Sequence, residues 1–132
     1  MKAKMEEFIK KHQAEVCEAL EHEEDPKNKF IPDQWTKEGN QGGSKGTTCF
    51  LHDGAVFEKA NVDASVYHGM LPPPAVAIMT GKGKKLSECE ETPFWACGVS
   101  GIIHPRNPYV PTFHFNLRYF EIEELLGIDF IW

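Results

Sequence analysis

The sequence has no long apolar run, no paired cysteine spacing and no excess of positive charge. No stretch approaches the ~20 consecutive apolar residues of a membrane-spanning helix, and the net charge of −6 disfavours nucleic acid as a partner. The N-terminal segment lacks the apolar core of a signal peptide and is too acidic for a transit peptide, which predicts a cytosolic location. The cysteines are scattered, which favours reduced thiols over a disulfide framework. They are Cys17, Cys49, Cys89 and Cys97.

The sequence also lacks the usual signatures of nucleotide, metal and hydrolase sites. In "GNQGGSKGTT", Lys45 is followed by glycine, so the segment does not match a phosphate-binding P-loop. Cys97, His104 and His114 do not have the short fixed spacing of a zinc site, and we expect no metal. Ser100 lacks the strand-to-helix elbow of a serine hydrolase, which weakens a Ser-His-Asp interpretation.

The sequence contains enough apolar residues for one core, because 41% of its 132 residues are hydrophobic. Apolar residues from Met5 to Leu20 follow the i, i+3, i+4 spacing of an amphipathic helix, which ends at or before Pro26. The glycine-rich segment "FIPDQWTKEGNQGGSKG" follows, and its punctuation predicts a loop.

From Thr47 onward the pattern is that of β-strands. The pair Asp53-Gly54 between "TTCFLH" and "AVFEKA" predicts a hairpin, and "NVDASVYHG" alternates as a further strand would. A short helix is expected near Pro74–Thr80, followed by a charged connection, "KGKKLSECEETP". Strands are expected from Phe94, from Thr112 to about Glu123, and at the terminal "FIW". We therefore predict an α+β fold with an antiparallel sheet flanked by helices, in a single domain spanning 1–132.

The strand "TFHFNLRYFEI" separates its side chains by type. Phe113, Phe115, Leu117 and Tyr119 fall on one face, and His114, Asn116 and Arg118 on the other. An arginine there suits bidentate capture of a carboxylate, and a histidine can move a proton near neutral pH. A solvated outer face of an edge strand is the open alternative.

A second strand, "GVSGIIH", is expected to return beside the first one and to bring Ser100 near His114. Ser100 lies between glycines, so its role is open between a ligand contact and tight strand packing. His104, directly before Pro105, is expected to cap a turn.

Two long stretches, "CFLHDGAVFEKANVDASVYHGMLPP" and "WACGVSGIIHPRNPYVPTFHFNLRYFE", resemble the oxygen-dependent coproporphyrinogen III oxidases of haem biosynthesis, over roughly Gly42 to Glu121. The resemblance implies oxidative decarboxylation of two propionates of coproporphyrinogen III to vinyl groups, giving protoporphyrinogen IX. Molecular oxygen is then the co-substrate, without an organic cofactor or metal. It also implies a homodimer with a cleft for the tetrapyrrole.

The resemblance also implies roles for particular residues. His114 matches the proposed proton donor of the family, the segment Asn116, Leu117 and Arg118 matches a substrate-binding segment, and Ser100 matches a second substrate contact. The chain is shorter than members of the family and lacks their acidic group for the pyrrole nitrogens and their later Gly-Gly-Arg segment, so we expect a truncated member. It either completes a cleft by dimerising, or is catalytically incomplete and binds only a porphyrin or a partner subunit.

Overall fold

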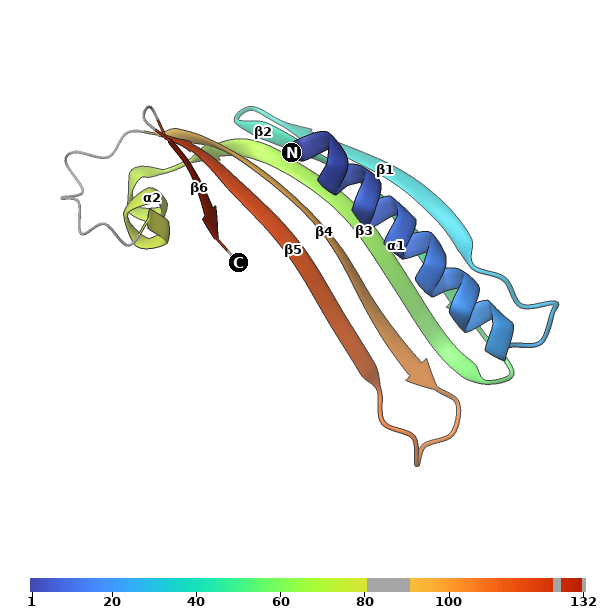
Figure 1. Cartoon of the computed structure of the whole chain (residues 1–132). Coiled ribbons are helices and arrows are strands. Elements are labelled where there is room, and N and C mark those ends of the chain that lie inside the picture. The colour runs from blue at the N-terminus through green and yellow to red at the C-terminus, as the bar shows by residue number, and fades with distance from the viewer. Residues whose placement is uncertain (81–90, 125–126, 132) are drawn as a thin grey trace.

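The chain forms an antiparallel meander with a long helix on one face (Figure 1). The computed structural model describes residues 1–80, 91–124 and 127–131. Six strands lie in the sheet in sequence order, from β1 to β6. The strands are β1 (Ile31–Gly39), β2 (Gly42–His52), β3 (Phe57–Leu71), β4 (Thr92–Pro105), β5 (Phe113–Glu124) and β6 (Gly127–Ile131). The predicted α+β class with an antiparallel sheet is confirmed.

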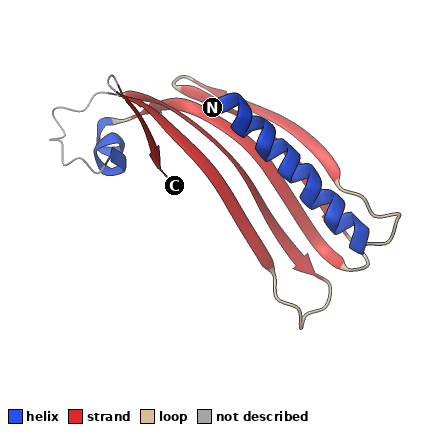
Figure 2. Ribbon diagram, in the orientation of Figure 1, coloured by secondary structure: helices blue, strands red, loops and turns tan. Residues whose placement is uncertain are grey.

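The predicted N-terminal helix is present as α1 (Lys2–Glu23), which lies lengthwise along the sheet (Figure 2). Its apolar stripe buries Ile9 and Cys17 against the middle of the sheet. The buried amide of Gln13 donates hydrogen bonds to the carbonyl oxygens of Thr47 at 2.6 Å and Val62 at 2.8 Å. These bonds fix the helix to β2 and β3 and satisfy an amide that would be costly to bury alone.

The core lies between α1 and one face of the sheet, here called the helix-covered face. Its central side chains are Val62, Ala64, Val66, Cys97 and Val99. The cross-strand pairs Ala64↔Val99 and Val66↔Cys97 place them on one side. Alternate residues of the same strands line the opposite side, here called the open face, which includes Asp63, Ser65, Gly98 and Ser100.

The prediction of a loop for "FIPDQWTKEGNQGGSKG" is wrong. Most of this segment forms β1 and the start of β2, which pair in a tight hairpin closed at Gly39↔Gly42. Gly42 has φ +152°, which explains a glycine at the turn. Gly46 lies under the Trp35 indole, whose Cζ2 would be 2.5 Å from an added Cβ. The glycines therefore allow side chains and backbone of the two strands to approach closely within the hairpin. Pro32 is tolerated because β1 is an edge strand.

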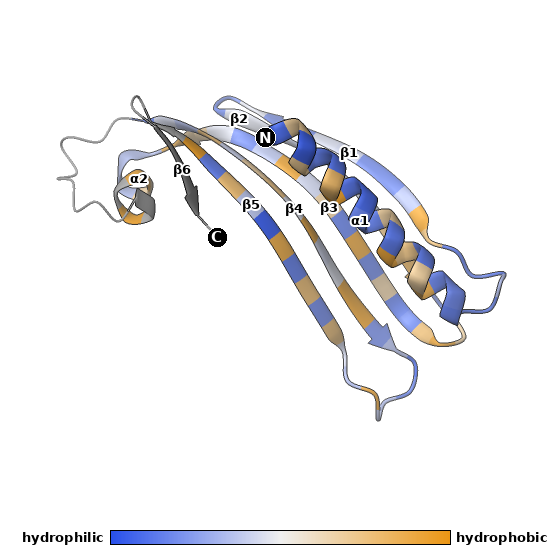
Figure 3. Cartoon of the chain, viewed as in Figure 1, coloured by the Kyte–Doolittle hydropathy of each residue, from blue (hydrophilic) through white to orange (hydrophobic). Residues whose placement is uncertain are grey.

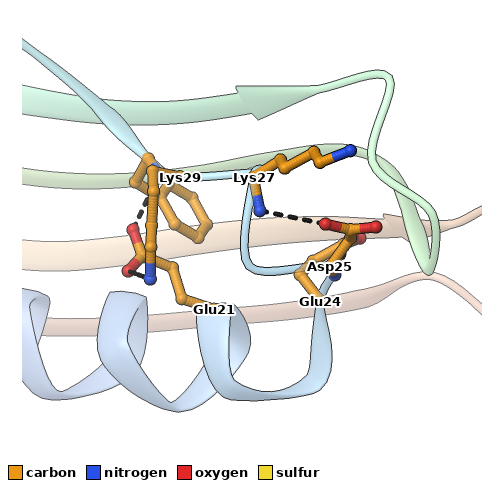
Figure 4. A network of polar contacts seen from close by, with 6 residues as sticks. Glu21, Glu24, Asp25, Lys27 and Lys29 are labelled. Carbon is orange, nitrogen blue, oxygen red and sulfur yellow. Dashed lines mark hydrogen bonds and ion pairs between the residues drawn. The ribbon is translucent and has the colours of Figure 1, made fainter.

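Acidic side chains organise the connection from α1 to β1 (Figure 4). Glu21 accepts hydrogen bonds from the Lys29 ammonium at 2.9 Å and the Phe30 backbone N–H at 2.8 Å. Asp25 accepts one from the backbone N–H of Lys27 at 3.0 Å. The helix thus ends before Pro26, as predicted, and the chain turns back toward the sheet.

The predicted Asp-Gly hairpin joins β2 to β3, with Asp53 at φ 54°. The buried Glu24 carboxylate accepts hydrogen bonds from the backbone N–H groups of Ala55, Val56 and Phe57. The Arg106 Nε also donates a hydrogen bond to the Gly54 carbonyl oxygen at 2.8 Å. Residues distant in sequence therefore hold this turn in place.

The predicted short helix is present as α2 (Pro73–Thr80), and the predicted last strand is present as β6. Most of the expected charged connection, including Cys89, lies outside the described residues, as does Trp132. Cys17, Cys49 and Cys97 are free, as predicted, and burial raises the pKa of Cys17 to about 12. Neither helix of the described ranges has the length and apolar character that crossing a membrane requires.

Candidate functional site

Strand β5 separates apolar and polar side chains as its sequence predicts, and Figure 3 shows this alternation along the strand. The pairs Val99↔Leu117 and Cys97↔Tyr119 place the odd-numbered residues of β5 on the helix-covered face. The even-numbered residues lie on the open face. Among them are His114, Asn116, Arg118 and Phe120.

Ser100 pairs directly with Asn116, whereas His114 pairs with Ile102. Ser100 and His114 therefore lie on neighbouring strands and on the same face, as expected, and they are diagonal neighbours, a relation that separates residues by about 7–8 Å. Asp63 pairs with Ser100 on the other side, so Asp63, Ser100 and Asn116 form one polar row across three strands.

The adjacent row on the same face consists of Ser65, Gly98 and Arg118, with the glycine at its centre. Gly98 pairs with Arg118 on one side and with Ser65 on the other. A Cβ added to Gly98 would lie 2.9 Å from the Leu117 carbonyl oxygen, so the two strands could not keep their spacing with a larger residue there. Gly98 itself contributes no side chain beside Arg118, on the face that carries Ser100.

Arg118 is exposed, and no carboxylate lies within ion-pair distance of it in the described ranges. Its planar guanidinium can therefore donate two hydrogen bonds to the two oxygens of a carboxylate on a ligand. His114 and Asn116 are also exposed on this face. The face thus presents a fixed cation, an amide and an imidazole from one rigid strand.

The side chain of Leu117 does not join this group. Its pairing with Val99 places it on the helix-covered face, so the predicted substrate segment has one member whose side chain is on the other side of the sheet. The structure also separates Cys97 from His114 by the thickness of the sheet. His104 Nδ1 lies 3.2 Å from the Thr112 hydroxyl, which supports the prediction that His104 caps the loop before β5. No cluster of three metal-ligating side chains occurs among the residues that the structure describes.

Three side chains that the sequence analysis did not select form a hydrogen-bond chain on the open face. The Trp35 indole N–H donates to the Thr48 hydroxyl at 3.1 Å, and that hydroxyl donates to Asp63 Oδ1 at 2.6 Å. The alternation of "NVDASVYHG" already placed Asp63 on one side of its strand. The sequence did not give the order and register of the strands, which place the Asp63 side chain directly beside Ser100 on the neighbouring strand.

Comparison with known proteins identifies relatives of this chain. The family model described as coproporphyrinogen III oxidase matches residues 4–132. The oxygen-dependent coproporphyrinogen-III oxidase of Drosophila melanogaster is 53% identical over 100% of this chain and 33% of its own length. The mitochondrial enzyme of Mus musculus is 50% identical over 100% of this chain and 29% of its own length. Chloroplastic coproporphyrinogen-III oxidase 1 of Arabidopsis thaliana is 42% identical over 93% of this chain and 31% of its own.

The relatives also correct the prediction of a cytosolic location. The mouse relative is named as mitochondrial and the Arabidopsis relative as chloroplastic, so the location inferred from composition is wrong. The chain spans 29–33% of the length of these three relatives. The resemblance carried by the two quoted stretches is confirmed over nearly the whole sequence, and the chain belongs to the coproporphyrinogen III oxidase family.

Proposed function

We propose that the open face of this chain binds coproporphyrinogen III and takes part in its oxidative decarboxylation to protoporphyrinogen IX. The observation that carries the proposal is the placement of Ser100, His114, Asn116 and Arg118 on one face of a chain that belongs to this family. The substrate has four carboxylates on its rim, and Arg118 is suited to one of them. Oxygen would be the co-substrate, and the proposal needs no metal or organic cofactor.

The reaction assigns a task to each of these side chains. Each reacting propionate loses CO₂, one proton from the carbon next to the ring and two electrons. Oxygen takes up the two electrons with two protons, so that one proton per propionate is supplied in addition to the one that leaves the substrate. His114 would transfer that proton, because imidazole exchanges protons near neutral pH. Ser100 and Asn116, paired across the ladder, would hydrogen-bond the same propionate that Arg118 holds, so that it is fixed relative to His114.

A second candidate function is binding without turnover. The described residues present their polar side chains on a single surface of a sheet, whereas a tetrapyrrole has carboxylates on several sides of its rim. A second copy of the chain would supply further groups, and we include a homodimer in the proposal for that reason. If no such groups are supplied, the face holds a porphyrin or a partner subunit without catalysis.

Turnover and binding measured together separate these functions. Purified protein would be supplied with coproporphyrinogen III in air and in buffer treated with a chelator, and protoporphyrinogen would be followed. His114→Ala would be compared with Lys11→Ala, a change on the exposed side of α1. Product that is lost only in the His114 variant supports the enzyme. Binding without product supports the second function, and a folded protein that neither binds nor turns over the substrate contradicts the proposal.

A further inference from the structure

Three basic side chains form a row across the open face, at the end nearest the β2–β3 hairpin. Lys59 on β3 pairs with His52 on β2 and with His104 on β4, so all three side chains project from one side of the sheet. Lys59 is exposed, and no carboxylate of the described ranges lies within ion-pair distance of its ammonium group. We call these three residues the basic row.

A shallow groove connects the basic row to the candidate site. Its volume is about 580 Å³, and its lining includes Phe50 and Ile102 together with the three basic residues. Ile102 pairs with His114, so the groove begins directly beside the candidate proton donor. Asp53 and Glu58 do not line this groove and belong to a separate hollow next to the basic row. The groove therefore has apolar side chains on its floor and basic side chains at its end.

Neighbouring side chains position both imidazoles of the basic row. His104 Nδ1 lies 3.2 Å from the Thr112 hydroxyl, and when that hydroxyl donates to Nδ1 the neutral ring carries its proton on Nε2. The ring of His52 lies against that of Phe50, with 5.0 Å between the ring centroids. An anionic group at the end of the groove thus meets a lysine ammonium group flanked by imidazole N–H donors, which are the groups that bind a carboxylate.

The distance from the basic row to Arg118 matches the width of one tetrapyrrole. Arg118 is aligned through Gly98 with Ser65 on β3, which is six residues from Lys59. With about 3.3 Å per residue along a strand and about 4.8 Å between strands, the Cα atoms of Arg118 and Lys59 are about 22 Å apart. Extended propionates on opposite sides of a tetrapyrrole place their carboxylates about 16 Å apart, from standard bond lengths. The long arginine and lysine side chains can cover the difference.

We propose that Lys59 is a second carboxylate receptor of the open face, which holds the propionate opposite the one that Arg118 holds. The inference rests on the proposed function and deepens it, because it fixes the orientation of the ligand. The line from Arg118 to Lys59 crosses β4 between Ser100 and Ile102, so the macrocycle lies there and beside His114. Two contacts at opposite sides of the rim restrain rotation of the ring, which one carboxylate contact alone would allow.

Two ligands that differ in the placement of their carboxylates test this assignment. Coproporphyrinogen III carries a carboxylate on each pyrrole ring, whereas deuteroporphyrinogen IX carries carboxylates only on two neighbouring rings. Neighbouring propionates lie closer together than opposite ones, so the second ligand does not contact Lys59 and Arg118 at once. Dissociation constants for both would be measured without oxygen by equilibrium dialysis, with the wild-type protein and with Lys59→Gln. The control variant Lys11→Gln removes the same charge from the exposed side of α1.

Lys59→Gln should lose about five- to tenfold in affinity for coproporphyrinogen III, since hydrogen bonds between charged groups have this order of strength. Its affinity for deuteroporphyrinogen IX should stay within about twofold of the wild-type value, and so should the affinity of Lys11→Gln for either ligand, because distant exposed charges are screened by salt. Unchanged affinity for coproporphyrinogen III in Lys59→Gln, equal losses for both ligands, or equal losses in both variants would overturn the assignment. A wild-type protein that does not bind coproporphyrinogen III would overturn the proposed function itself.

Discussion

Ser100 and Asn116 face each other across the β4–β5 ladder, on the side of the sheet that α1 does not cover. Two residues further along each strand, on the same face, Gly98 faces Arg118. Both positions belong to continuous strands, so their side chains are held by the ladder rather than by a loop. This rigidity is what a binding site for a charged ligand requires, because a receptor on a sheet loses little freedom when the ligand arrives.

Arg118→Ala should weaken binding of coproporphyrinogen III more than Arg118→Lys. The planar fork of donors is lost in both variants, but the positive charge survives in the lysine variant. We expect a loss of about tenfold or more for alanine and a smaller loss for lysine, from the strength of charge-assisted hydrogen bonds. Titration of both variants under anaerobic conditions measures this, and equal losses would argue against a carboxylate on Arg118.

His114→Ala should lower kcat by about 10²- to 10⁴-fold, the usual contribution of a proton-transferring side chain. KM should change by less than about threefold, because binding rests mainly on Arg118 and its neighbours. Steady-state rates over a range of coproporphyrinogen III concentrations would separate the two constants. A large rise in KM with an unchanged kcat would make His114 a residue that positions the substrate.

Gly98→Ala should destabilise the protein and weaken ligand binding together. The added methyl group would meet the Leu117 carbonyl oxygen at 2.9 Å, and moving β5 displaces Arg118. We expect a loss of about 1–3 kcal/mol in the free energy of unfolding, typical of overpacking. Gly39→Ala is the matched control, because its Cβ would make only an ordinary contact of 3.4 Å. Equal urea midpoints for the two variants would contradict this account.

Glu24 should make the stability of the fold depend on pH in the acid range. Burial alone would raise its pKa, but hydrogen bonds from the Phe57 N–H, the Asn28 amide and the N–H groups of Val56 and Ala55 outweigh burial and lower the pKa to about 2. The carboxylate is charged in the folded state at pH values where the unfolded chain is already protonated. Its stabilisation is therefore complete above the ordinary value of 4.5 and is lost as the pH falls through about 2.

Urea unfolding of Glu24→Gln beside the wild-type protein measures this effect. At pH 7 the variant should be less stable by about 2 kcal/mol, and the difference should shrink as the pH falls below 4 toward 2. Glu23→Gln, an exposed neighbour, serves as the control and should show little change. A difference that is constant from pH 7 to pH 2 would show that Glu24 acts through packing alone. The same curves, if they show one transition, would support the prediction that 1–132 is a single domain.

The sequence was sufficient for the parts of the fold that depend on local periodicity. The alternation in β5 correctly placed His114, Asn116 and Arg118 on one face, and the spacing of apolar residues from Met5 predicted α1. The hairpin at Asp53 followed from its turn chemistry. These features depend on neighbours along the chain, which a single sequence displays.

The features that the sequence did not specify depend on distant segments. The register of β4 against β5 is set where the ladder ends at Ile103↔Phe113, and alternation cannot distinguish registers that differ by two residues. Strand β1 and the start of β2 were missed because Gly39, Gly42, Gly43 and Gly46 resemble the punctuation of a loop, whereas the structure places the Trp35 indole over Gly46 within a hairpin. Asp63 was missed because its relation to the site exists only across three strands.

The most direct test of the account compares two neighbouring residues of β5 that lie on opposite faces of the sheet. Arg118 lies on the open face, and Leu117 lies on the helix-covered face with 45% of its surface exposed. Dissociation constants for coproporphyrinogen III would be measured anaerobically for Arg118→Ala and Leu117→Ala. The account predicts a loss of about tenfold or more for the first variant and less than about twofold for the second. A larger loss in Leu117→Ala than in Arg118→Ala would place the ligand on the other face and contradict the account.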